Sequence, residues 1–144
     1  MPWVLKVFLR SIYRVVSCIF KKGTNDLPGL EKLLKDYKVD MVFYGHKHTY
    51  ERMWPIYDKV GYKSGDAGHI KNAKAPVYIL TGSAGCHTHE GPSDTTPQSF
   101  SASRLGQYGY TRLKVYNSTH ISTYFVDTDD KVGNFLDRFY LEKD

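Results

Sequence analysis

The chain has 144 residues, of which 41% are hydrophobic and 15% aromatic, and its formal net charge is +5. This length suits one compact domain, and this much apolar content excludes an intrinsically disordered chain. The basic residues are mostly scattered and no nucleic-acid-binding motif accompanies them, so we expect no nucleic-acid partner. Two cysteines, Cys18 and Cys86, allow at most one internal disulfide and do not fix the compartment.

Residues 1–23 combine apolar side chains with a basic stripe at helical spacing. A helix with this pattern suits a membrane surface or another polyanionic partner. The charges interrupt the apolar run and no small-residue cleavage site follows it. The segment is therefore a poor signal peptide and is not expected to span a membrane. The stripe consists of Lys6, Arg10, Arg14, Ser17 and Lys21.

Residues 24–38 predict an amphipathic helix. Thr24, Asn25 or Asp26 can cap its start, and Pro28 suits the first turn. Apolar residues then recur every three or four positions, and we expect this side to pack on a sheet. The apolar side consists of Leu27, Leu30, Leu33, Leu34 and Tyr37, and the polar side of Glu31, Lys32, Lys35 and Asp36.

Two histidines follow the next apolar run. Residues 41–44 predict a buried strand, and Gly45 at its end allows a sharp turn. His46 and His48 stand two positions apart, so in an extended segment both would face the same side. Neutral imidazole is the commonest metal ligand, and sites in α/β sheets tend to lie at strand ends. A solvated pair of loop histidines is the alternative interpretation.

The next stretch predicts a loop and then a second buried strand. Residues 56–74 are polar and glycine-rich and predict a long surface loop or a hairpin, with His69 exposed in it. Residues 77–80 predict a buried strand that is closed by glycines. Cys86, His87, His89 and Glu90 then supply zinc-ligand residue types, although a structural or incidental role is the simpler interpretation.

The last third predicts an antiparallel meander after a polar loop over residues 91–107. Residues 110–116 alternate in polarity, residues 120–126 form the next strand, and a final strand ends near Leu141. Three strands with one buried face can pack stably against another sheet or helix. The turn between the first two carries Asn117-Ser118-Thr119, an acceptor sequence for N-glycosylation. We expect His120, at a strand start, to be a surface residue.

The string Gly-His-Lys-His-Thr-Tyr-Glu-Arg at residues 45–52 resembles the GHxHxYER motif of the purple acid phosphatases, which are binuclear metallophosphoesterases. Residues 75–86 and the segments 108–113 and 117–121 resemble the C-terminal region of animal members. The likeness runs from about Gly29 to about Leu141. Residues 2–5, Pro-Trp-Val-Leu, resemble the start of a family strand that should end in Gly-His-Arg-Pro, but no histidine follows here.

The resemblance implies a chemistry and roles for the motif residues. Two metal ions, iron with zinc, iron or manganese, would polarise a phosphate monoester and acidify a bound water that attacks phosphorus. His46 and His48 would each bind one of the two metals. Glu51 and Arg52 would hold the loop from behind the ligands, and Tyr50 would pack beneath it.

The resemblance also exposes a gap. The family takes most of its ligands from upstream Asp-x-Gly, Gly-Asp-x-x-Tyr and Gly-Asn-His elements, and none of these occurs here. We therefore expect an inactive C-terminal fragment of an acid phosphatase, with no catalytic residue assigned and an incomplete or absent metal centre. The alternative is a non-enzymatic scaffold, or a membrane- or polyanion-binding module that uses residues 1–23.

These inferences predict an α/β fold: an incomplete half of a metallophosphoesterase β-sandwich flanked by helices, with a C-terminal antiparallel meander. Residues 1–60 would be the remnant of the catalytic domain and residues 75–141 the C-terminal segment. An exposed apolar surface should then remain and favour self-association. The family is mostly secreted or lysosomal. This chain lacks a clear signal peptide, so we expect Asn117 to stay unmodified if synthesis starts at Met1.

Overall fold

The computed structural model describes residues 3, 5–8, 29–86, 96–129 and 133–144. Five strands form one mixed sheet in the order β1-β2-β7-β3-β8. They are β1 (Leu5–Phe8), β2 (Met41–Tyr44), β3 (Tyr50–Met53), β7 (Val77–Thr81) and β8 (Ser101–Leu105). β1, β2 and β7 run parallel, whereas β3 is antiparallel to both β7 and β8.

The second sheet has four strands in the order β6-β11-β10-β9. They are β6 (His69–Lys71), β9 (Gly109–Val115), β10 (His120–Asp127) and β11 (Phe135–Glu142). β9, β10 and β11 form the predicted antiparallel meander, and β6 adds to β11 in parallel. The two short strands β4 (Ile56–Tyr57) and β5 (Val60–Gly61) pair as a separate hairpin.

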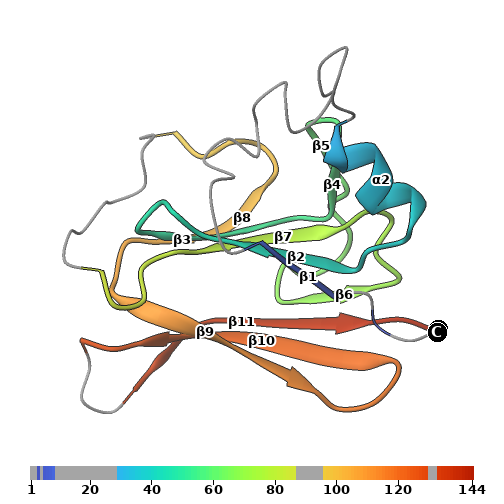
Figure 1. Ribbon diagram of the computed structural model, residues 1–144. Coiled ribbons are helices and arrows are strands. Elements are labelled where there is room, and N and C mark those ends of the chain that lie inside the picture. Colours follow the sequence, from blue (N-terminus) through green and yellow to red (C-terminus); the bar gives the residue numbers. More distant parts are fainter. Residues whose placement is uncertain (1–2, 4, 9–28, 87–95, 130–132) are drawn as a thin grey trace.

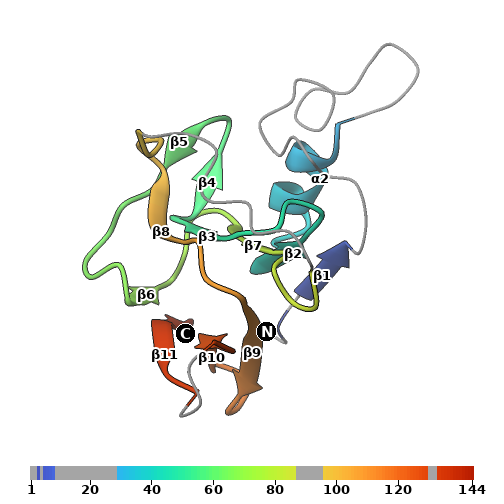
Figure 2. The ribbon, with the colours of Figure 1, turned by 90° about the vertical axis from the view of Figure 1, so that its left-hand side faces the viewer.

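The fold has three layers (Figures 1 and 2). The four-stranded sheet covers one face of the five-stranded sheet, and helix α2 (Leu30–Asp36) lies over the other. Side chains of β2 and β7 alternate between the two interfaces, because Val77 and Ile79 pack toward the meander while Tyr78 and Leu80 pack toward the helix. This double burial explains why both strands are continuous apolar runs in the sequence. The predicted fold class is confirmed.

Helix α2 presents a different side to the sheet from the one that the sequence predicts. Leu34 is buried as expected, but so is Glu31, whose carboxylate accepts a hydrogen bond of 3.0 Å from the Asp58 backbone N–H. Leu30, Leu33 and Tyr37 are exposed instead. The prediction was wrong because the β4–β5 hairpin supplies a polar partner for Glu31, on the side of the helix that was expected to face water. Residues 24–28 of the predicted helix lie outside the described residues.

Two other predictions need correction or completion. Residues 101–105 form β8 rather than part of a loop, because their polar sequence pairs with β3 without entering a fully apolar interface. The hairpin alternative for residues 56–74 is confirmed, whereas β6 was not predicted. In the N-terminal segment, residues 5–8, which include Lys6 of the stripe, form a strand beside β2. The other stripe residues, Arg10, Arg14, Ser17 and Lys21, lie outside the described ranges.

The described residues leave apolar side chains exposed on helix α2 and on the edge strand β9, where Leu113 and Val115 are 39% and 52% exposed. In the part of the chain that the structure describes, no helix combines the length and hydropathy that a membrane crossing needs.

Candidate metal-binding loop

The two motif histidines lie in the loop of residues 45–49, which joins β2 to β3. This loop follows the carboxyl end of β2, and β2 and β7 run parallel, so it stands beside Gly82 at the end of β7. His46 is exposed and His48 is half-buried. Both therefore lie outside the core, at the edge of the sheet where α/β proteins usually bind ligands.

The backbone of this histidine loop is tightly constrained. His46 has a positive φ of 84°, a conformation that non-glycine residues adopt at an energetic cost. Gly82 approaches so closely that a Cβ there would lie 2.1 Å from the carbonyl oxygen of Lys47. Thr49 fixes the other end, since its hydroxyl donates to the Leu105 carbonyl at 2.9 Å and its own carbonyl accepts from the Gly82 N–H at 3.2 Å. The surrounding chain thus holds His46 in its strained geometry.

Tyr50 and Arg52, directly after the loop, point into the interface between the two sheets. The Tyr50 hydroxyl donates to Oδ2 of Asp137 at 2.6 Å. The Arg52 guanidinium donates through Nε to Oδ2 at 2.7 Å and through Nη2 to Oδ1 at 3.0 Å of the same carboxylate. The side chains of Arg52 and Asp137 are only 3% and 10% exposed, so this bidentate ion pair is well shielded from water. Strand β3 is thereby linked to β11.

Glu51 lies on the opposite side of β3 from Tyr50 and Arg52. Its carboxylate is 3.9 Å from Nε of Arg104, its cross-strand neighbour on β8. Burial, with the nearby Glu51 carboxylate adding to it, raises the pKa of the Tyr44 hydroxyl. Tyr50 and Arg52 therefore contact β11, and Glu51 contacts β8.

The described donors do not make up a complete binuclear centre. Imidazole is a suitable ligand for zinc or iron, but one metal ion needs at least four ligands and a structural or catalytic zinc takes at least three from the protein. Within the described ranges, no group of three or more His, Cys, Asp or Glu side chains is placed to hold a metal ion. His46 and His48 thus fit the role of partial ligands and no more.

The other candidate residues lie apart from this loop. His69 and His120 are exposed at the far end of β11, with Nε2 atoms 3.2 Å and 3.9 Å from Oε2 of Glu142. Asn117 is exposed at the tip of the β9–β10 turn, where its Oδ1 accepts from the Thr119 N–H at 2.8 Å. Cys86 is a free thiol, and His87, His89 and Glu90 lie outside the described residues.

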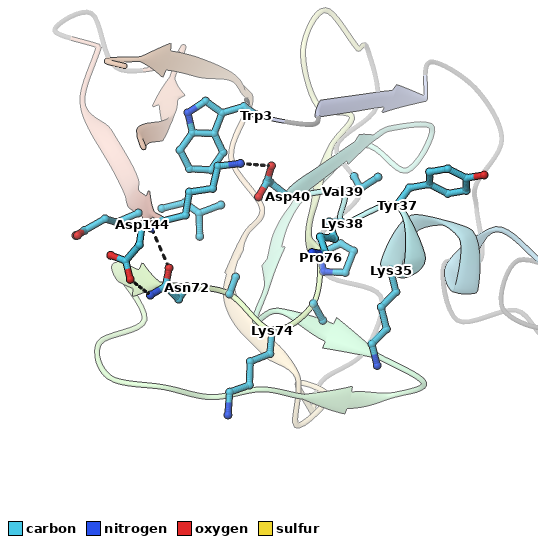
Figure 3. Close-up of a pocket in the computed structure, with 15 residues that line it drawn as sticks. Trp3, Lys35, Tyr37, Lys38, Val39, Asp40, Asn72, Lys74, Pro76 and Asp144 are labelled. Atoms are coloured by element: carbon cyan, nitrogen blue, oxygen red, sulfur yellow. Dashed lines mark hydrogen bonds and ion pairs between the residues drawn. The ribbon is translucent and has the colours of Figure 1, made fainter. Parts of the chain in front are cut away.

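A groove of about 630 Å³ opens at the opposite end of the sheets (Figure 3). Asp40 precedes β2 and Pro76 precedes β7, so the groove lies at the amino ends of these parallel strands. Lys143 bridges it by an ion pair of 2.9 Å to Asp40, and its ammonium lies 4.1 Å from the centre of the Trp3 ring. Lysines and carboxylates both line its wall, and the groove is remote from the histidine loop.

Two residues that shape the histidine loop were not identified as site residues from the sequence. Gly82 is visible there only as a glycine that closes a strand, with no sign that it faces the loop 35 residues earlier. Asp137 lies 85 residues from Arg52 in an ordinary strand. The signal that could have found it is the buried arginine of the motif itself, because a buried guanidinium requires a carboxylate partner.

Comparisons with known proteins match this chain to the purple acid phosphatases. The family model described as iron/zinc purple acid phosphatase-like protein C matches residues 75–138. Acid phosphatase type 7 of Danio rerio is 36% identical over 156 residues, which cover 99% of this chain and 35% of that protein. The Homo sapiens acid phosphatase type 7 is 37% identical, covering 97% of this chain and 34% of that protein. The chain thus spans about a third of the length of these relatives.

A solved structure agrees with the fold. Purple acid phosphatase PPD1 from yellow lupin (Lupinus luteus) seeds superposes with a TM-score of 0.78 and 22% sequence identity, over 99% of this chain and 25% of that one. The purple acid phosphatase family implies a binuclear metal centre, and the described residues of this chain include no group of three or more side chains that could hold a metal ion. The chain is a purple acid phosphatase-like protein and corresponds to the C-terminal region of that family.

Proposed function

We propose that the chain contributes the histidine loop of a metal-dependent phosphomonoesterase, and that these 144 residues alone do not turn over phosphate esters. The observation that carries the proposal is the placement of His46 and His48 together on a constrained loop at the carboxyl end of β2, outside the core. A strained backbone at His46 supports it as well, because strain of this kind clusters at functional sites.

The finer parts of the proposal come from the family. His46 and His48 would serve as one ligand each to two metal ions, iron together with zinc, iron or manganese. The substrate class would be a phosphoric monoester at acid pH, and the setting secretory or lysosomal. The chain's own residues would fix the two imidazoles in place, while further donors would come from residues other than the described ones.

Metal titration tests the ligand role. We expect weak Zn²⁺ binding by calorimetry that the His46→Ala/His48→Ala double variant loses. The matched control is His69→Ala/His120→Ala, which removes two exposed histidines at the far end of β11 and should leave the binding unchanged. Equal loss in both double variants, or none in either, would contradict the ligand role.

Turnover tests the other half of the proposal. Phosphate monoester hydrolysis is among the slowest uncatalysed reactions, and two loop histidines cannot supply the barrier reduction that it needs. We expect no hydrolysis of p-nitrophenyl phosphate by the purified chain with iron and zinc supplied. Hydrolysis that disappears in the His46→Ala/His48→Ala variant would show that the chain completes its own site.

A further inference from the structure

We infer that Asp137, on a strand of the C-terminal meander, positions the histidine loop through Tyr50 and Arg52. This inference rests on the proposed ligand role of His46 and His48. It adds a residue from a remote part of the sequence to the site and gives the meander a function in holding the ligands. The three side chains Tyr50, Arg52 and Asp137 are called the Asp137 clamp below.

The clamp is a closed set of charge-assisted contacts. Asp137 accepts three hydrogen bonds, from the Tyr50 hydroxyl and from Nε and Nη2 of Arg52. The remaining donor of the guanidinium, Nη1, reaches the Ala67 carbonyl at 2.7 Å. The carbon of the guanidinium lies 4.6 Å from the centre of the Phe139 ring. A planar guanidinium held on several sides cannot shift without losing several contacts together, so it fixes the position of β3.

The clamp is joined to the ligands by a short connection along the chain. Tyr50 follows His48 after a single residue, and that residue, Thr49, is itself anchored to Leu105 and Gly82. Gly82 contacts the loop at Lys47, on the other side of His48. The backbone around His48 is therefore fixed before and after the imidazole. Releasing the clamp would loosen β3, which begins directly after Thr49, the second of these two anchors.

Position distinguishes this role from general stabilisation. The Asp40–Lys143 ion pair also links the two sheets, but it lies at the opposite end of the strands, beside the groove of Figure 3. The Arg52–Asp137 pair joins β3 to β11, whereas the Asp40–Lys143 pair joins the residue before β2 to the residue after β11. If Asp137 only stabilised the sandwich, loss of either carboxylate would affect the histidine loop equally once global stability is matched.

The experiment compares Asp137→Asn with Asp40→Asn. Both substitutions are isosteric and remove one negative charge from a sheet-to-sheet ion pair. Urea is added to the more stable variant until the two have equal free energies of unfolding. Amide hydrogen exchange at Thr49 and Gly82, whose N–H or carbonyl groups close the loop, is then measured together with Zn²⁺ affinity.

Relative to Asp40→Asn, we expect both amides to exchange faster and Zn²⁺ to bind more weakly in Asp137→Asn. The loss of affinity should be about ten-fold or more, which is the usual cost of removing a group that orients a metal ligand. The change in exchange rate should be about as large. Equal exchange rates in the two variants would overturn the positioning role. If Asp137→Asn does not fold, Tyr50→Phe is the fallback, because it removes one of the three hydrogen bonds to Asp137. It should change the exchange rates and the Zn²⁺ affinity in the same direction by a smaller factor. No change in either quantity would overturn the inference.

The two readouts separate the failure of this inference from failure of the proposed function. Zn²⁺ binding that survives in His46→Ala/His48→Ala would refute the ligand role, whereas loop exchange would still report whether Asp137 positions the loop.

Discussion

The two ends of the β-sandwich are joined in different ways. At the histidine end, Arg52 and Asp137 form a bidentate pair with side chains 3% and 10% exposed. At the groove end, Lys143 meets Asp40 through one contact of 2.9 Å with side chains 17% and 18% exposed, and Lys71 contacts Glu142 and Asp144 on the surface. A buried bidentate pair fixes geometry, whereas exposed single contacts adjust to solvent and salt. The comparison indicates that rigidity is concentrated where the two histidines lie.

The largest effect should come from breaking the buried pair. Arg52→Leu leaves the Asp137 carboxylate desolvated with only the Tyr50 hydroxyl as partner, which costs about 3–5 kcal/mol of unfolding free energy. Urea denaturation followed by tryptophan fluorescence measures it. Arg104→Leu on the neighbouring strand is the control, because its contact with Glu51 is a long 3.9 Å, and it should cost less than half as much. Equal losses would show that the buried pair has no special weight.

Overpacking at Gly82 should have the second-largest effect. In Gly82→Ala the new methyl would meet the Lys47 carbonyl oxygen at 2.1 Å, so the loop must move. We expect a loss of about 1–3 kcal/mol and altered NMR signals of His46 and His48. Gly45→Ala is the control, because its Cβ would lie 3.7 Å from the nearest atoms, an ordinary contact. Unchanged histidine signals in Gly82→Ala would mean that the loop accommodates the methyl without moving.

Tyr50 should make the histidine end sensitive to alkali. Burial, followed by the Asp137 carboxylate, raises the pKa of the Tyr50 hydroxyl above its ordinary value of 10.0. The unfolded chain therefore releases this proton first, so the stabilisation is complete below pH 10 and is lost as pH rises beyond it. Above pH 10 the slope from one such group is about 1.4 kcal/mol per pH unit.

Tyr50→Phe should remove this contribution to the slope. Tyr44 and Tyr78 are also buried with raised pKa values, so a part of the alkaline slope should remain. Denaturation curves between pH 9 and 11 measure the slope for Tyr50→Phe and for the unsubstituted chain. An alkaline slope identical to that of the unsubstituted chain would contradict the assignment to Tyr50.

How much of this the sequence predicts depends on whether the deciding contacts are local. The buried strands β2 and β7 and most of the meander are predictable, because burial leaves a periodic or continuous apolar pattern. The buried side of helix α2 is not, because the partner of Glu31 is a backbone N–H 27 residues away. Strand β8 is missed because its sequence, Ser-Ala-Ser-Arg-Leu, carries no such pattern. The motif gives Arg52 but not Asp137, since a buried ion pair leaves no periodic signal.

The backbone strain at His46 should make glycine a more stable replacement than alanine there, an effect smaller than the losses above. Because φ is 84° there, His46→Gly should be about 1 kcal/mol more stable than His46→Ala, since glycine adopts positive φ at no steric cost. Thermal unfolding of the two variants measures the difference. At His48, whose φ is not positive, the order should reverse, with alanine the more stable replacement. A gain from glycine at both positions would point to general loop flexibility rather than to strain at His46.

The smallest effect should come from the exposed cluster of His69, Lys71 and Glu142 at the groove end, and it should appear at acid pH. The hydrogen bond from Lys71 lowers the pKa of the Glu142 carboxyl below its ordinary value of 4.5. The positive charge of Lys71 and the hydrogen bond from His69 lower it further. The unfolded chain therefore takes up this proton first as pH falls. The stabilisation is present above pH 4.5 and is lost as pH falls through the lowered pKa in the native state.

Glu142→Gln should therefore flatten the stability profile slightly between pH 5 and 3 and leave the alkaline limb unchanged. Asp129→Asn, which removes an exposed carboxylate from the β10–β11 connection, is the matched control for net charge. Because the cluster is open to solvent, added salt should weaken the effect of Glu142 while leaving the cost of Arg52→Leu nearly constant. A Glu142 effect that resists salt would mean that the groove end is shielded from solvent as well, and the contrast between the two ends would then be lost.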